Sequence, residues 1–319
     1  MRLATLSAAG RDGALAVVSA DGARAKDASP VAPTLQNALE RWGEVALALE
    51  ALTAGSEGWF ALDATRLRAP LPRAWQWLDG SAFDCHGALM DKVFGITVEK
   101  DGRTLMYQGV SDQFYGPADD VPVPSTDLGI DFEGEFGVIV DEVPMGTSAQ
   151  AAMDHIKLIV QINDWSLRAL AGAEMKTGFG WIQAKPPCSM APFAVTPDEL
   201  GDQWRNGRVC LDLHVDWNGT RFGAANGEPM SVGFHELVAH AARTRKLVAG
   251  TVIGSGTVSN ENYREIGSSC IAERRGIEIV DEGAARTEFM RFGDRVRMEG
   301  VTRDGRAPFG AIDQKVVQA

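Results

Sequence analysis

Three carboxylates stand at alternate positions in the stretch Ile130–Asp141, which reads Ile-Asp-Phe-Glu-Gly-Glu-Phe-Gly-Val-Ile-Val-Asp. In an extended strand alternate side chains point to opposite faces, so Asp131, Glu133 and Glu135 are expected to share one face. The apolar, β-branched residues that follow lead the strand into a core. Carboxylates that lose hydration there need a positive partner. The pattern therefore leaves two interpretations, a solvated edge of an amphipathic strand or a metal site.

A fourth carboxylate, Asp164, follows the apolar run 156–162 in the sequence Asn-Asp-Trp-Ser. It either caps a helix that begins at Trp165 or reaches a neighbouring strand that carries Glu133. Lys185 lies in the mostly apolar stretch Trp-Ile-Gln-Ala-Lys-Pro-Pro. A lysine in such a setting either extends outward to solvent or reaches an acidic site.

Two loops add candidate polar groups. The stretch 254–259 reads Gly-Ser-Gly-Thr-Val-Ser and follows an apolar strand, but it lacks the third glycine of a dinucleotide-binding loop. It forms either a simple tight turn or a turn whose backbone N–H groups point at a carboxylate. The other loop runs from Asp79 to His86, and an isolated loop histidine is more often structural than catalytic.

Composition excludes several classes of function. The chain has 319 residues, 45% hydrophobic and 23% charged, as is typical of a globular protein with a sizeable core. Its net charge of −12 argues against nucleic-acid binding. The four cysteines are far apart, which excludes a thiolate zinc site and a disulfide framework. Without a signal-peptide pattern or an apolar run of membrane-spanning length, we expect a cytoplasmic protein without membrane contact.

The chain divides into a small α+β part, residues 1–72, and a larger part, residues 73–319, with the boundary at a Pro- and Arg-rich stretch. In the first part we expect short strands and one helix from Thr34 to Ala54, where apolar residues recur at helical spacing. In the second part, short apolar segments alternate with turns and predict a β-rich, mixed or antiparallel domain. These segments are Phe94–Val98, Phe136–Val140, Ile156–Ile162, Val209–Val215, Leu247–Ile253 and Arg295–Met298, and the clearest helix is Phe234–Arg245.

Together these stretches resemble the fumarylacetoacetate hydrolase family. The resemblance covers about residues 76–275 and rests on pieces that occur in the family's order: Asp79 with His86 seven residues on, Asp131-Phe-Glu133-Gly-Glu135, Asn163-Asp164-Trp-Ser166, Lys185, and Gly256-Thr257-Val-Ser259. It implies an α+β, β-rich fold with a mixed β-roll catalytic domain, a small N-terminal α+β domain, and a homodimer.

The resemblance also implies a divalent-cation site. Four carboxylates would supply the ligands: Asp79, Glu133, Glu135 and Asp164. An all-oxygen site favours Mg²⁺, Ca²⁺ or Mn²⁺ over zinc. His86 is implied to be the general base that activates water, with Lys185 as a positive donor where charge develops. Asp131 is not one of the family's ligands, so we expect it to support the ligands from behind or to face solvent.

These roles fit hydrolysis of a C–C bond in a β-diketo acid. The leaving group is an enolate, which a cation chelating the diketone would stabilise. The implied substrate is fumarylacetoacetate, cleaved to fumarate and acetoacetate at the end of tyrosine and phenylalanine catabolism.

The sequence departs from the family at the carboxylate partner of the histidine. The corresponding position is Ile271, and we select Glu273 instead, because it lies on the same face if Cys270–Arg274 is extended. In the other major branch of the family the histidine is paired with a glutamate three residues on, but here that residue is Leu89. The retained His86 therefore favours hydrolysis.

The substrate-contacting positions differ as well. A tyrosine of the family is replaced by Ser81 and an arginine by Gly95, for which Lys92 is a candidate substitute. Gly256 and Thr257 are the remaining expected substrate contacts. Because of these differences, hydrolysis of an acylpyruvate or fumarylpyruvate, and decarboxylation or tautomerisation of a 2-oxo acid, remain alternatives. A non-enzymatic β-domain stabilised by Ca²⁺ is a further one.

Overall fold

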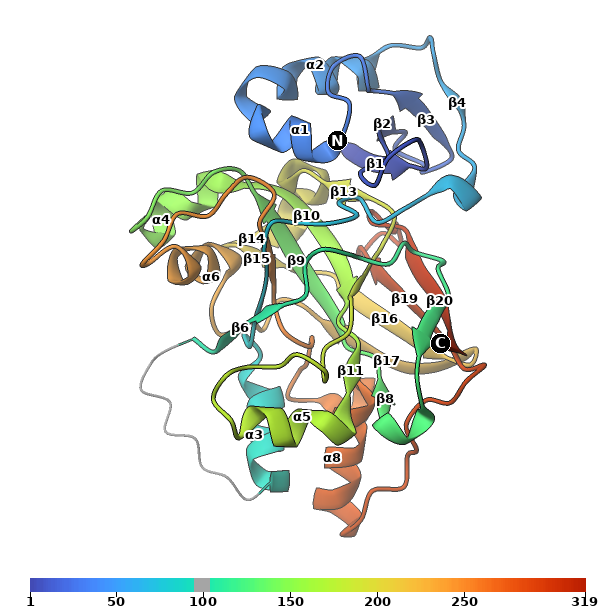
Figure 1. Ribbon diagram of the computed structural model, residues 1–319, viewed down its shortest axis with the longest axis vertical. Helices are drawn as coiled ribbons and strands as arrows, with labels where there is room; N and C mark the ends of the chain where they lie inside the picture. Colours follow the sequence, from blue (N-terminus) through green and yellow to red (C-terminus); the bar gives the residue numbers. More distant parts are fainter. Residues whose placement is uncertain (95–103) are drawn as a thin grey trace.

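The computed structural model describes residues 1–94 and 104–319. They form β-sheets with short helices around them (Figure 1). The strands are Arg2–Leu6 (β1), Ala14–Val18 (β2), Arg24–Asp27 (β3), Phe60–Ala61 (β4), Trp77–Gly80 (β5), Met106–Gly109 (β6), Val121–Val123 (β7), Ile130–Asp131 (β8), Gly134–Val140 (β9), Ile156–Asn163 (β10), Ser166–Leu167 (β11), Ser189–Met190 (β12), Ala194–Val195 (β13), Trp204–Arg205 (β14), Arg208–Val209 (β15), Asp212–Trp217 (β16), Thr220–Asn226 (β17), Val252–Gly254 (β18), Arg295–Val301 (β19) and Ala311–Gln318 (β20). The α-helices are Leu35–Glu40 (α1), Trp42–Ala54 (α2), Asp84–Phe94 (α3), Ala149–Ala152 (α4), Arg168–Met175 (α5), Phe234–Ala241 (α6), Tyr263–Ile266 (α7) and Ile271–Glu282 (α8).

The largest sheet of the described residues joins both parts of the chain. Its strands follow the order β4-β3-β2-β1-β13-β10-β9-β18-β5-β6, with β12 beside β10. Most neighbours are antiparallel, but β18 and β5 run parallel, so the sheet is mixed. Pairing of β1 with β13 continues the N-terminal strands into the larger part. The order also places β5, β18, β9 and β10 next to one another, which brings their polar ends together.

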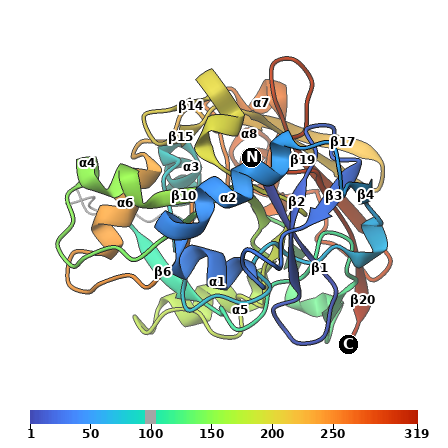
Figure 2. The same ribbon diagram turned by 90° about the horizontal axis from the view of Figure 1, so that it is seen from above.

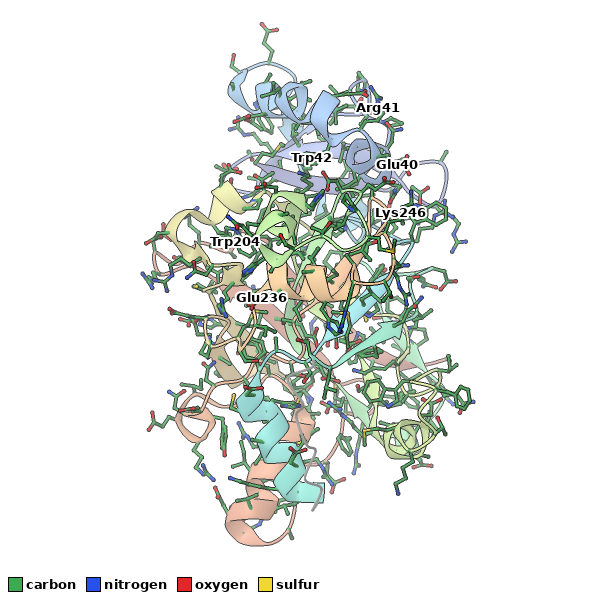
Figure 3. The ribbon with its side chains drawn as sticks, turned by 90° about the vertical axis from the view of Figure 1, so that its left-hand side faces the viewer. Glu40, Arg41, Trp42, Trp204, Glu236 and Lys246 are labelled. Atoms are coloured by element: carbon green, nitrogen blue, oxygen red, sulfur yellow. The ribbon has the colours of Figure 1, made fainter. Side chains whose placement is uncertain are left out.

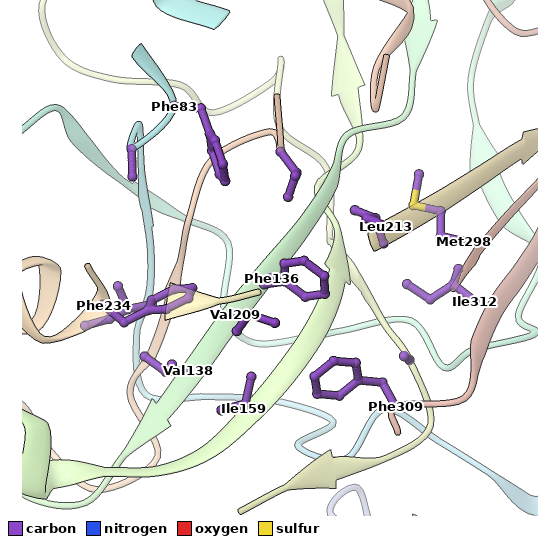
Figure 4. Packing of buried hydrophobic residues seen from close by; sticks show 14 of the residues in the cluster. Phe83, Phe136, Val138, Ile159, Val209, Leu213, Phe234, Met298, Phe309 and Ile312 are labelled. Carbon is purple, nitrogen blue, oxygen red and sulfur yellow. The ribbon is translucent and has the colours of Figure 1, made fainter. Parts of the chain in front are cut away.

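A second sheet, in the order β17-β16-β19-β20-β7, packs against the first. The core between the sheets contains Phe136, Val138, Leu213, Met298 and Phe309, all of them buried (Figure 4). Phe136 and Val138 belong to this core, whereas Ile139 belongs to a core on the opposite face of the sheet. The alternation along β9 follows from the two-residue repeat of a strand.

The N-terminal part covers one end of the molecule, with α1 and α2 next to the strands β1–β4 (Figures 1 and 2). The single helix expected from Thr34 to Ala54 is instead two helices. Arg41 separates them, because its φ of −127° and ψ of 26° lie outside the helical region (Figure 3). Leu35, Leu39 and Leu49 are buried against the large sheet. The domain boundary near residue 72 stays a prediction.

Several segments of the larger part differ from the sequence-based expectation. The segment 209–215 is divided between β15 and β16, and 247–253 is extended only from Val252. The helix expected at 234–245 ends at Ala241. In the segment 94–98, Phe94 is the last residue of α3. Residues 95–98 lie outside the described residues, and these include Gly95, the position at which the family has an arginine.

Helices α3, α5 and α8 lie together at the end of the molecule opposite the N-terminal part (Figure 1). Among the described residues, no helix has the length and apolarity needed to cross a membrane.

Candidate active site

Four strand ends meet at one place in the large sheet. Asp79 stands near the end of β5, Glu135 near the start of β9, and Asp164 directly after β10. Because β5 pairs with β18, β18 with β9, and β9 with β10, these side chains come from adjacent strands. Asp164 therefore does not cap a helix, since β11 follows it and α5 begins only at Arg168.

Asp79, Glu135 and Asp164 form a buried acidic triad. One carboxylate oxygen from each lies within 4.8 Å of the others. Neither oxygen of Glu135 accepts a hydrogen bond from any N–H or O–H donor of the described residues, although both are buried. A buried carboxylate without a donor is costly unless a cation neutralises it. The donor set fits a divalent cation that prefers oxygen ligands, such as Mg²⁺, Ca²⁺ or Mn²⁺.

Electrostatics agree with this fit. Burial, together with the neighbouring carboxylates, raises the pKa of Asp79 and of Glu135 well above the ordinary values. The protein alone therefore disfavours the charged form of both groups, and a divalent cation would reverse this preference.

Three donors hold Asp164 in place. Its Oδ2 accepts hydrogen bonds from Lys185 Nζ at 2.5 Å and from the hydroxyl of Tyr107 at 2.6 Å, and its Oδ1 accepts one from the Cys188 thiol at 2.9 Å. Burial, followed by the charge of Asp164, raises the pKa of Tyr107 well above its ordinary value, so this phenol is a donor at neutral pH. Lys185 thus reaches the acidic site rather than solvent, and it also donates to Glu133 Oε1 at 2.7 Å.

Glu133 lies beside the triad and is surrounded by donors. Its Oε1 accepts a hydrogen bond from Ser166 at 2.6 Å and lies 3.1 Å from Arg168 Nη2, and its Oε2 accepts one from Thr257. Burial alone would raise the pKa of Glu133, but Arg168 and Lys185 hold it well below the usual range. Glu133 is thus ionised and close to the triad, and its role as a metal ligand stays a prediction.

Asp131 shares Arg168 with Glu133 but does not line the cavity. The strand is interrupted after it, between β8 and β9, so Asp131 and Glu133 do not simply alternate along one face. The Asp131 side chain is fully buried, which corrects the solvent-facing alternative. It accepts hydrogen bonds from the backbone N–H groups of Ile271 at 2.7 Å and Ala272 at 2.9 Å, at the start of α8. Asp131 therefore supports the site from behind.

His86 and Glu273 form the expected pair, 3.3 Å from Nδ1 to Oε1. The geometry differs from the prediction, because the segment 270–274 is not extended: Glu273 lies in the first turn of α8. His86 is in the first turns of α3, which packs beside α8 through Gly276, where a Cβ would meet Met90 at 2.7 Å. The hydroxyl of Ser259 also donates to Glu273 Oε1.

Asp79, Glu133 and His86 line one cavity of about 560 Å³, and the other two triad residues lie behind this wall. Its walls include Asp79, Ser81, His86, Glu133, Tyr107, Trp181, Arg168, Lys185, Gly256 and Thr257. The Gly254–Ser259 turn does direct an N–H at a carboxylate, since Gly256 N donates to Asp79 Oδ1 at 3.1 Å. Lys92 is exposed on α3 and does not belong to this wall.

The sequence matches two families of domain. The family described as fumarylacetoacetate (FAA) hydrolase C-terminal matches residues 77–317, and fumarylacetoacetase N-terminal domain 2 matches residues 1–73. The chain belongs to the fumarylacetoacetate hydrolase family. Its predicted family and β-rich α+β fold are therefore confirmed.

Relatives within the family include named hydrolases. A 2,4-didehydro-3-deoxy-L-rhamnonate hydrolase of Sphingomonas sp. (strain SKA58) is 29% identical over 156 residues, which cover 48% of this chain and 52% of that protein. The match thus spans about half the length of this relative.

Two solved structures share the fold over the full length of both chains. They are maleylpyruvate hydrolase of Sphingobium sp. SYK-6 with manganese(II) and pyruvate, TM-score 0.69 at 17% identity, and the fumarylacetoacetate hydrolase of Exiguobacterium antarcticum, TM-score 0.70 at 18% identity.

Several residues of the site were not predicted from the sequence. Tyr107, Trp181, Arg168 and Cys188 come from segments without a recognisable chemical pattern, and only pairing of β5 with β6 brings Tyr107 opposite Asp79.

Proposed function

We propose that this member of the family hydrolyses a C–C bond in a β-diketo acid with the help of a divalent cation. The observation that carries the proposal is the His86–Glu273 pair, because His86 lines the same cavity as Asp79 of the acidic triad and Glu133. A structural cation site would need the three carboxylates but not a histidine–carboxylate pair beside them.

His86 acts as the base. With Nδ1–H donating to Glu273 Oε1, the other ring nitrogen, Nε2, is free to accept a proton from water. The water oxygen bonds to the acyl carbonyl carbon, and the neighbouring C–C bond then breaks. Its electron pair passes to the leaving enolate, which the imidazolium or a water molecule protonates. Glu273 keeps the ring in the required tautomer and stabilises the imidazolium.

The end of the cavity next to the acidic triad would bind the diketone group of the substrate. Asp79, Glu135 and Asp164 would hold the cation, with Glu133 as a fourth ligand or a bridge to Lys185. The cation, when bound, supplies Lewis-acid stabilisation of the enolate. Lys185 is fixed by Glu133 and Asp164, so its ammonium group stands ready where negative charge develops.

Two substrates fit this chemistry. Fumarylacetoacetate is the one implied by the sequence resemblance, and an acylpyruvate is the alternative. The maleylpyruvate hydrolase of similar fold supports the acylpyruvate, because its structure contains manganese and pyruvate.

The test is product analysis with fumarylacetoacetate, acetopyruvate and oxaloacetate in the presence of Mg²⁺ or Mn²⁺. Wild type is compared with His86→Ala and with the control His240→Ala, whose residue lies on α6 outside the cavity wall. We expect hydrolysis of a diketo acid by wild type and by the control, and a large loss in His86→Ala. Decarboxylation of oxaloacetate that persists in His86→Ala would instead assign a decarboxylase.

A further inference from the structure

The outer part of the cavity is apolar, in contrast to its acidic end. Leu105 and Met106 contribute from the start of β6, Met175 from the last residue of α5, and Trp181 from the segment after α5. Leu105 and Met175 remain about half exposed, at 56% and 50%, so they form the rim of an open cavity. A substrate that places its diketo acid group at the carboxylates would therefore extend its acyl substituent between these four side chains.

Trp181 is a fixed part of this rim. Its indole N–H donates to Ala171 O at 3.2 Å, and its ring packs edge-to-face on Tyr107 with 4.7 Å between centroids. The segment around it is anchored to α5 by Glu174, whose carboxylate accepts backbone N–H groups of Ile182, Gln183 and Ala184 at 2.9–3.1 Å. A preformed apolar wall binds an apolar group without an ordering cost.

The cations of the cavity are already paired. Lys185 contacts Glu133 and Asp164, and Arg168 lies 2.8 Å from Asp131 and 3.1 Å from Glu133. No other lysine or arginine contributes to the cavity wall as described by residues 1–94 and 104–319. Among the side chains of the described residues, a second carboxylate on the acyl substituent would therefore find no unpaired cation beside Met175 and Trp181.

We propose that the natural substrate carries an uncharged, apolar acyl substituent, aromatic or branched aliphatic, rather than a second carboxylate as in fumarylacetoacetate. The inference rests on the proposed function and narrows its substrate class. Trp181 and Met175 determine this specificity, because they contact the part of the substrate that does not react.

The experiment compares kcat/KM for benzoylpyruvate, acetopyruvate and fumarylpyruvate with Mn²⁺. We expect benzoylpyruvate to exceed fumarylpyruvate by at least about tenfold, within the usual range for filling an apolar pocket. Equal values, or a preference for fumarylpyruvate, would overturn this inference while leaving the hydrolase assignment intact. If none of the three is cleaved, the proposed function fails, and calorimetric binding of the same compounds to His86→Ala still measures the preference without turnover.

Three variants locate the specificity in the rim. Trp181→Ala is expected to lower kcat/KM for benzoylpyruvate about tenfold and for acetopyruvate, with its methyl substituent, much less. Met175→Lys should shift the ratio toward fumarylpyruvate about tenfold, because it adds a counter-charge at a half-exposed position that tolerates substitution. Phe179→Ala is the control, since Phe179 is 96% exposed and does not contribute to the wall. Unchanged ratios in both rim variants would overturn the assignment of these residues.

Discussion

Asp131 and Arg168 form an ion pair, 2.8 Å from Oδ2 to Nε, in which the carboxylate is fully buried. The pair connects two parts of the site. Arg168 also contacts Glu133 beside the acidic triad, and Asp131 accepts two backbone hydrogen bonds at the start of α8. The helix that carries Glu273 is thereby fixed relative to the segment that contains Glu133, directly before β9.

Replacement of Asp131 by Ala is expected to lower the free energy of unfolding by about 3–5 kcal/mol, because it removes one of the two carboxylates that face Arg168 and leaves the N–H groups of Ile271 and Ala272 without their acceptor. Denaturant unfolding measures the change. Asp281→Ala is the matched control. Asp281 lies on α8, is exposed, and forms an ion pair with Arg264 of α7. A similar loss in both variants would contradict a special role of the buried pair.

The histidine pair is expected to act as a unit. His86→Ala should reduce kcat by about 10²–10⁴-fold, the usual contribution of a general base. Glu273→Gln should also lower kcat strongly, and the double variant should be little worse than His86→Ala alone. Calorimetric affinity for Mn²⁺ should stay near the wild-type value in all three. Multiplying losses in the double variant would show that the residues work independently, and loss of Mn²⁺ binding would make His86 a ligand.

Glu135 and Glu133 should differ in their effects on stability. Glu135→Gln replaces a buried carboxyl group whose oxygens accept no hydrogen bond, so we expect the variant to fold well in EDTA but to lose the rise in Tm that Mn²⁺ gives the wild type. At a concentration of 100 times Kd, that rise corresponds to about 2.7 kcal/mol. Glu133→Ala should lose Mn²⁺ binding and also lower Tm in EDTA, because Lys185 and Arg168 each lose one of their two carboxylate partners.

Thermal unfolding with and without Mn²⁺ separates the two cases, with exposed Glu142→Gln as the control. An undiminished Mn²⁺ effect in Glu135→Gln would remove Glu135 from the site.

Glu278 of α8 makes hydrogen bonds to the segment after the helix, and their contribution to stability is expected to depend on pH. Its carboxylate accepts hydrogen bonds from Arg286 N at 2.6 Å, Thr287 N at 2.9 Å and Thr287 Oγ1 at 2.5 Å. Partial burial alone would raise the pKa of Glu278, but these donors lower the pKa below its ordinary value of 4.5. A carboxyl with a lowered folded-state pKa stabilises the protein above its unfolded pKa, and this stabilisation is lost as pH falls through the folded pKa.

Wild type should therefore be more stable than Glu278→Gln at pH 7, and the difference should shrink in acid. Denaturant midpoints at several pH values measure it. A difference that is constant with pH would contradict this account of Glu278.

Much of the acidic site could be predicted from the sequence, because each of its carboxylates stands at the end of an apolar strand. The strand pattern places Glu135 and Asp164 at strand ends, and the family's spacing adds Asp79. The buried position of Asp131 was one of two predicted alternatives, and the sequence alone could not decide between them, because the break between β8 and β9 interrupts the simple alternation of faces.

Glu273 lies beside His86 as expected, and its role as the catalytic partner stays a prediction, but the local structure differs from the expected one. Cys270–Arg274 was expected to be extended, whereas α8 begins at Ile271 because the Asp131 carboxylate and the Cys270 cap satisfy its first N–H groups. Asp131, which accepts the N–H of Ile271, lies 140 positions away from it in the chain. Arg168 and Trp181 escaped prediction for the same reason, since tertiary contacts rather than local pattern bring them to the cavity.

The most direct test of the central claim is turnover of an acylpyruvate in H₂¹⁸O with Mn²⁺ or with EDTA. Water attacks the acyl carbonyl in the proposed reaction, so the account predicts pyruvate together with a carboxylic acid that carries one ¹⁸O. It also predicts that EDTA abolishes the reaction and that His86→Ala slows it by about 10²–10⁴-fold. Release of CO₂, an isomerised product without label, or an undiminished rate in EDTA would contradict metal-dependent hydrolysis of a C–C bond by this chain.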